Sequence, residues 1–208
     1  MKSRILIIEG TSGVGKSHLA DALVRKYIDE NKKIRSLLYL TQAHIYGPLA
    51  VDEDKGTLTK EMNTKHLDRI QAALEWLASS LGSEHNVEFY CLADTLHITQ
   101  CVRPGIIEWK DIAPYDTKLK QIECKLIFIK AKPATIWDRG IVPRLKDQFM
   151  LEYARKFGRN PGEIHQYFVD EQQKLEMLAT NSSLERLVLN AETDFKSNVD
   201  EAYRFWHQ

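Results

Sequence analysis

Two glycines, a lysine and a serine near the amino terminus have the spacing of a phosphate-binding loop. Gly10, Gly15, Lys16 and Ser17 fit the pattern G-x-x-x-x-G-K-[ST]. Glycines let a loop turn its backbone N–H groups inward and approach a phosphate closely, because no Cβ obstructs the dihedral angles or the contact. The lysine adds a full positive charge, and the serine hydroxyl suits Mg²⁺. The stretch therefore predicts binding of a polyphosphate.

Each position of this loop has an expected part in holding a nucleotide. The N–H groups at the start of the following helix add partial positive charge. Lys16 is expected to meet the β- and γ-phosphates of ATP, and Ser17 to bind the Mg²⁺ that bridges them. Nucleotide contacts are predicted at Gly10, Thr11, Ser12, Gly13, Val14, Gly15, Lys16, Ser17 and His18.

The elements around the loop alternate in the βαβ pattern of a parallel sheet. Short apolar runs predict strands at 4–9, 34–41, 87–93, 124–131 and 186–191. Apolar residues at helical spacing predict helices at 16–33, 63–81, 161–179 and 195–208. Further helices are expected at 133–139, where Gly140 and Pro143 should end the pattern, and at about 145–157. Residues 42–62 are polar and are predicted to be irregular.

Composition excludes several classes of partner. The chain has 208 residues, with 29 basic and 29 acidic side chains and a formal net charge of zero, which argues against binding nucleic acid or an anionic membrane through bulk charge. No run approaches the ~18 apolar residues of a membrane span, and the first strand leaves no room for a signal peptide. Cys91, Cys101 and Cys124 lack metal-binding spacing, so we expect reduced thiols and a cytoplasmic protein. A homodimer is left open.

The stretch IIEGTSGVGKS, residues 7–17, resembles the opening of the P-loop kinases of nucleosides and nucleoside monophosphates, thymidylate-kinase-like members especially. Those proteins often carry a glutamate before the first glycine, as Glu9 does here. The resemblance implies one domain over residues 1–208, built on a three-layer, doubly wound, five-stranded parallel sheet of the P-loop NTPase type. It also implies a helical lid at about residues 139–160, with ATP and Mg²⁺ as cofactors.

Other P-loop branches lack their own signatures in this chain. The guanine-reading N/T-K-x-D element of GTPases is missing after the fourth strand, where FIKAKPAT stands, and the L-S-G-G-Q signature of transporter ATPases is absent. A small-molecule kinase is left as the favoured function, and it needs an acidic residue near the acceptor and a cationic lid.

The acidic residue is expected to be Asp94. It ends the third predicted strand, at the edge where doubly wound sheets bind ligands, and a carboxylate there can orient an acceptor hydroxyl or hold Mg²⁺ through water. Thymidylate-kinase-like proteins end this strand in Asp-Arg or Glu-Arg, whereas Asp94 is followed by Thr95, which argues against a thymidylate-like substrate. Glu9 is the alternative base, and a turn or helix cap is the alternative role for Asp94.

The lid is predicted from local charge. Between Arg139 and Arg159 there are six basic and two acidic residues, in a chain with no net charge. Arginines that arrive when a site closes meet the negative charge of a transferring phosphoryl group. Arg139 and Arg144 are the predicted catalytic arginines, and a solvated helical face is the alternative for either.

The acceptor site is the least specific part of the prediction. The segments after the second and third strands carry polar and aromatic side chains that suit a nucleobase, a sugar or an aromatic antibiotic equally well. The candidates are Gln42, His44, Tyr46, His97, Gln100 and Arg103. Two other functions stay open, namely a nucleotide-binding regulator or slow ATPase and an antibiotic-modifying phosphotransferase.

Overall fold

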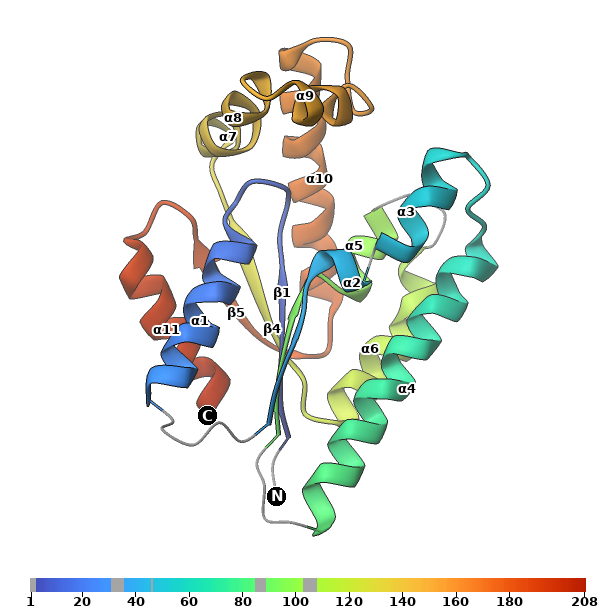
Figure 1. Ribbon diagram of the computed structural model, residues 1–208, viewed down its shortest axis with the longest axis vertical. Coiled ribbons are helices and arrows are strands. Elements are labelled where there is room, and N and C mark those ends of the chain that lie inside the picture. Colours follow the sequence, from blue (N-terminus) through green and yellow to red (C-terminus); the bar gives the residue numbers. More distant parts are fainter. Residues whose placement is uncertain (1–2, 31–35, 46, 85–88, 103–107) are drawn as a thin grey trace.

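Five parallel strands form the centre of the molecule. The computed structural model describes residues 3–30, 36–45, 47–84, 89–102 and 108–208 (Figure 1). Within them the order across the sheet is β2-β3-β1-β4-β5, and every neighbouring pair is parallel. The strands are β1 (Ser3–Glu9), β2 (Ser36–Leu40), β3 (Phe89–Asp94), β4 (Lys125–Lys130) and β5 (Glu185–Asn190). The predicted α/β class with five parallel strands is confirmed.

Helices cover both faces of this sheet. On one face lie α1 (Lys16–Glu30) and α11 (Phe195–His207), and on the other lie α4 (Lys60–Glu84) and α6 (Trp109–Gln121) (Figure 1). Successive residues of β1 point to opposite faces, so Leu6 and Ile8 join one apolar core while Ile5 and Ile7 join the other. A parallel sheet covered on both faces needs apolar residues at every position of its central strand.

The register of the sheet brings two acidic strand ends together. Ile8 of β1 is paired with Asp94 of β3, so Glu9 and Asp94 both lie at the carboxyl edge of the sheet. The predicted phosphate-binding loop leaves β1 at this same edge and leads directly into α1. Parallel strands with helical crossovers place all such loops on one side of the sheet, which is where ligands of α/β proteins bind.

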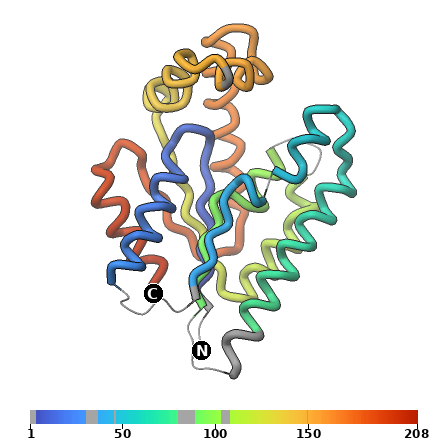
Figure 2. Tube along the Cα trace, viewed as in Figure 1, coloured from blue at the N-terminus to red at the C-terminus, as the bar shows by residue number. Residues whose placement is uncertain are grey.

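Short helices lie beyond this edge, above the loop. They are α7 (Pro133–Ile136), α8 (Val142–Leu145) and α9 (Gln148–Ala154), with the π-helical turn η1 (Trp137–Ile141) between the first two (Figure 2). The long helix α10 (Pro161–Asn181) follows them, and Asn160 caps its first turn by accepting a hydrogen bond from the N–H of Glu163. This segment, in which the sequence predicted a lid, therefore lies above the loop.

Two parts of the prediction are wrong. Gly140 and Pro143 do not end a helix: the chain passes through η1, which widens the turn, and Pro143 occupies the first turn of α8, where its missing N–H costs nothing. Residues 42–62 are largely helical, with α2 (Gln42–Ile45), α3 (Gly47–Asp54) and the start of α4. These two helices are too short for a periodic apolar pattern, and the buried side chains of Ile45 and Leu49 hold them in place.

Two helices of the structure were not predicted at all. They are α5 (His97–Val102), directly after β3, and α6, which contains Pro114.

Among the described residues, no helix is long and apolar enough to cross a membrane.

Candidate active site

The glycines of the loop adopt conformations and contacts that a side chain would prevent. Gly13 and Gly15 have φ angles of +86° and +103°, in the region that favours glycine. A Cβ placed on Gly13 would lie 2.4 Å from the Cα atom of Gly140 in η1. The loop and the lid segment therefore touch backbone to backbone, and this contact requires a glycine on the loop side.

Lys16 lies across the loop that precedes it. Its Nζ atom donates to the carbonyl oxygens of Gly10, at 2.9 Å, and of Thr11, at 3.1 Å. The ammonium group thus sits at the start of the loop, next to the first turn of α1.

Ser17 and Asp94 meet at the carboxyl edge of the sheet. The hydroxyl of Ser17 donates to Oδ2 of Asp94 at 2.7 Å, and Oγ1 of Thr95 lies 3.4 Å from the other carboxylate oxygen. Asp94 is buried, whereas Ser17 is exposed. A hydroxyl and a carboxylate at this separation are the oxygen donors that Mg²⁺ prefers. The described residues contain no group of three or more His, Cys, Asp or Glu side chains that could hold a metal ion, so phosphate and water oxygens would have to complete the coordination.

A cavity of about 730 Å³ runs from the loop to the end of β5. Arg139 and Arg144, the two arginines predicted for the lid, both line it, as does Gln42. At the loop end it is bounded by residues 12–19, and at the far end by Ala191, Thr193, Phe195 and Asn198. Its size suits a nucleotide.

Both arginines are already held against the site. Nη1 of Arg139 donates to the carbonyl oxygen of Ala191 at 3.0 Å. Nη2 of Arg144 donates to Oγ of Ser12 in the loop at 2.5 Å, and its Nη1 donates to the carbonyl oxygen of Gly140. The guanidinium of Arg144 also lies 5.2 Å from the centre of the Phe168 ring. The predicted lid segment therefore contacts the loop through a charged side chain as well as through the two glycines.

Glu9 has a different environment from the one predicted for a base. It is fully buried, and Oε1 accepts from the N–H groups of Leu96, at 2.9 Å, and Thr99, at 3.5 Å. Its Oε2 accepts from the hydroxyl of Thr99. These contacts make Glu9 a cap for the first turn of α5. Neither Glu9 nor Asp94 is among the residues that line the nucleotide-sized cavity.

His97 likewise faces the interior. Its Nε2 atom lies 3.0 Å from Oδ1 of Asp116 in α6, which also accepts hydrogen bonds from Ser182 and Ser183 after α10. Burial alone raises the pKa of Asp116, but the hydrogen bonds from His97, Ser182 and Ser183 outweigh it and lower this pKa to about 2. The network joins three segments of the chain beneath the site.

The remaining acceptor candidates are dispersed. His44 is exposed, and its Nδ1 lies 3.0 Å from Oγ1 of Thr41, at the start of α2. Gln100 is fully buried, and neither amide atom has a hydrogen-bond partner among the described residues. Tyr46 and Arg103 lie outside the residues that the structure describes.

Two side chains near the site were missed by sequence reasoning. Glu171 of α10 is buried and accepts a hydrogen bond from the hydroxyl of Thr11 in the loop. Tyr39 of β2 has its pKa raised to about 12, mainly by burial and further by the negative charges of Asp94 and Asp21. Tyr39 could have been predicted from its position near the end of the second strand, because the candidate site lies at the edge of the sheet where the strands end. No local pattern marks Glu171, which lies 160 residues from Thr11.

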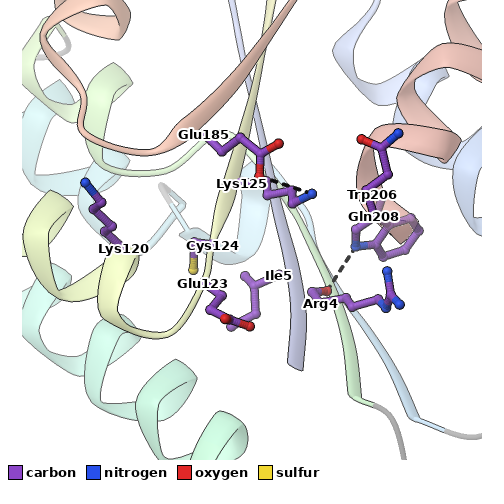
Figure 3. Close-up of a pocket in the computed structure, with 9 residues that line it drawn as sticks. All are labelled: Arg4, Ile5, Lys120, Glu123, Cys124, Lys125, Glu185, Trp206 and Gln208. Atoms are coloured by element: carbon purple, nitrogen blue, oxygen red, sulfur yellow. Dashed lines mark hydrogen bonds and ion pairs between the residues drawn. The ribbon is translucent and has the colours of Figure 1, made fainter. Parts of the chain in front are cut away.

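A second cavity, of about 250 Å³, lies at the opposite edge of the sheet (Figure 3). Its charged groups are of both signs, and they include Lys125, which forms an ion pair with Glu185 at 3.2 Å. The indole N–H of Trp206 donates to the carbonyl oxygen of Arg4 at 2.9 Å and closes one side. This cavity contains none of the loop, lid or strand-end residues that the predicted chemistry needs.

Comparisons with known proteins bear on the fold. No protein-family model and no curated protein matches this sequence. Among solved structures, the chain is similar to the YorR protein of Bacillus subtilis, determined in complex with phosphorylated GDP. The two chains share one fold. The TM-score is 0.58 with 12% sequence identity, over 98% of this chain and 95% of YorR.

Proposed function

We propose that this protein is an ATP- and Mg²⁺-dependent kinase that transfers the γ-phosphoryl group to a nucleoside, a nucleotide or a similar small acceptor. We also propose that it is one domain of the doubly wound P-loop NTPase type, with a lid at about residues 139–160. The observation that carries the proposal is the shared cavity: the loop residues Lys16 and Ser17 and the arginines Arg139 and Arg144 all line it.

The donor side follows from the loop. Its inward N–H groups and the first turn of α1 offer positive charge to the triphosphate, and Lys16 adds an ammonium group at the same place. Ser17 and Asp94 are the residues that would hold Mg²⁺, which when bound neutralises charge on the phosphate oxygens. Arg139 and Arg144 add positive charge from the opposite wall, where it stabilises charge on the transferring group.

The acceptor side rests on Asp94. Its Oδ2 atom is engaged by Ser17, so Oδ1 is the oxygen that would accept the proton of an acceptor hydroxyl. Glu9 is committed to the first turn of α5 and is the weaker candidate for this role. A neighbour of the same fold was determined with a phosphorylated guanine nucleotide, which supports a nucleotide as ligand and makes GTP a necessary comparison with ATP.

The test is a two-part assay on the intact chain. Calorimetry with Mg²⁺ should detect uptake of ATP or GTP. A panel of nucleosides, nucleoside monophosphates, sugars and aminoglycosides should then contain an acceptor that increases ADP or GDP production at least ~10-fold over basal hydrolysis, since transfer requires an oriented acceptor. Tight uptake with no acceptor-dependent product would instead favour a nucleotide-binding regulator, and no uptake of either nucleotide would contradict both functions.

A further inference from the structure

Thr95, directly after Asp94, has a backbone conformation that threonine rarely adopts. Its φ angle is +76°, and Glu123 is the only other non-glycine residue in the described part of the chain with a positive φ. In the left-handed region the Cβ atom crowds the backbone, and the second branch of threonine adds to the conflict. Residues strained in this way persist only where the surrounding structure holds them, and they gather at functional sites.

The end of β1 holds this turn in place. The N–H of Thr95 donates to the carbonyl oxygen of Ile8 at 2.8 Å, and the N–H of Leu96 donates to Oε1 of Glu9 at 2.9 Å. Thr95 itself is 1% exposed, so its side chain is packed in the interior. Two consecutive residues of β1 thus fix the path of the chain from β3 into α5.

This turn determines which groups lie next to the Asp94 carboxylate. Its Oδ2 atom accepts from Ser17 at 2.7 Å, while its Oδ1 atom lies 3.4 Å from the hydroxyl of Thr95. The two oxygens therefore face two different hydroxyl groups, which defines the rotation of the carboxylate. Glycine would make the same turn without strain. What threonine adds at this position is the hydroxyl beside Asp94 and a stiff side chain in a buried setting.

We propose that Thr95 is a positioning residue, which turns the Asp94 carboxylate toward Ser17 and keeps it there for the Mg²⁺ of a bound nucleotide. The inference rests on the proposed function, because it assigns Asp94 to the metal side of the nucleotide site. Thr95 acts through Asp94 and makes no contact of its own with the nucleotide.

Three substitutions separate strain from positioning. Thr95→Gly removes both the strain and the hydroxyl, Thr95→Val keeps the branched shape and removes the hydroxyl, and Thr95→Ser keeps the hydroxyl. Glu123→Gly is the matched control, because it relieves the other left-handed residue, which lines the second cavity at the opposite edge of the sheet. Two quantities are measured on each full-length variant: the thermal midpoint without nucleotide, and the Mg²⁺ concentration that gives half-maximal ATP uptake in calorimetry.

We expect Thr95→Gly to raise stability and to weaken the response to Mg²⁺. Its thermal midpoint should rise by about 2–4 °C, as should that of Glu123→Gly, because strain is relieved. Its Mg²⁺ midpoint should rise about 5–10-fold, as should that of Thr95→Val, because the carboxylate is less well oriented. Thr95→Ser and Glu123→Gly should keep the Mg²⁺ midpoint of the wild type.

Two results would overturn the inference. Unchanged Mg²⁺ midpoints for both Thr95→Gly and Thr95→Val would show that Thr95 does not orient Asp94. If the folded wild type takes up neither ATP nor GTP, the proposed function fails and this inference fails with it. This outcome is distinguishable because nucleotide uptake is then absent from the wild type and from every variant.

Discussion

Ser17 and Asp94 are joined by a 2.7 Å hydrogen bond although they are 77 residues apart in the sequence. Ser17 is the second residue of α1, the helix after β1, and Asp94 ends β3, the strand that pairs with β1. The bond therefore exists because these two strands are neighbours and parallel, so that their carboxyl ends open onto the same side. It places a hydroxyl and a buried carboxylate together at the loop where a phosphate would bind.

Replacing Lys16 by alanine should weaken nucleotide uptake at least ~10-fold, because a charge-assisted hydrogen bond to phosphate contributes about 1.5–3 kcal/mol. Calorimetry with ATP and Mg²⁺ measures this directly. Lys26→Ala is the control, since Lys26 lies on the same helix but pairs with Asp200 of α11. Equal loss of uptake in both variants would point to damage to the helix rather than to the site.

Replacing Asp94 by asparagine should cut turnover by about 100-fold or more if Asp94 is the base, and should leave ATP uptake without Mg²⁺ unchanged. Steady-state rates with the acceptor found in the panel provide the measurement. An unaltered rate would transfer the role of base to Glu9.

Glu9→Gln should act mainly on stability. The carboxylate accepts hydrogen bonds from two N–H groups and one hydroxyl in a fully buried place, and the new amide nitrogen cannot accept any of them. We expect a loss of about 1–3 kcal/mol in the free energy of unfolding, measured in urea. A stable but inactive Glu9→Gln variant would contradict the capping role.

Arg144→Lys should lower turnover more than it raises the KM for ATP. Lysine keeps the charge but loses the fork through which Arg144 reaches both Ser12 and Gly140. Lys146→Ala is the control, because Lys146 is an exposed basic residue of the same segment that does not line the cavity. If both variants reduce turnover equally, the local charge matters and the position of Arg144 does not.

Asp116 should make stability depend on pH between about 4 and 2. Its pKa is lowered to about 2 in the folded protein from an ordinary 3.8, so the stabilisation is complete above pH 4 and is lost as pH falls through 2. The difference corresponds to about 2 kcal/mol. Urea unfolding as a function of pH should show this slope in the wild type and a flatter one in Asp116→Asn. Identical slopes would contradict the assignment.

Glu123→Gly should stabilise the protein by about 0.5–1 kcal/mol. Helix α6 ends with Glu123 N–H donating to Lys120 at 3.0 Å and Cys124 N–H donating to Leu119 at 3.0 Å, the hydrogen bonds of a Schellman motif. Glu123 has φ +56° at the position where glycine is common. A fall in the urea midpoint would mean that its side chain makes a favourable contact that outweighs the strain.

The sequence alone was enough to predict a phosphate-binding loop and the strands around it. The spacing of Gly10, Gly15 and Lys16 is a property of consecutive residues, and so is the alternation of apolar runs that predicted all five strands. Asp94 was placed at the carboxyl edge of the sheet because strand ends in a βαβ pattern share one side. The predicted ends of helices were less reliable. Gly140 was expected to end a helix, but the chain continues through it in the π-helical turn η1.

Tertiary structure decided what each polar side chain contacts. Glu9 and His97 carry the residue types of acid–base catalysis, yet burial turns the first into a cap for α5 and the second into a partner of Asp116. Nothing local to Thr95 indicates a left-handed backbone, and nothing near Ser12 indicates that Arg144 closes over it. Such contacts join residues that are distant in sequence, so they depend on how the strands pair and where the lid lies, which no stretch of neighbouring residues encodes.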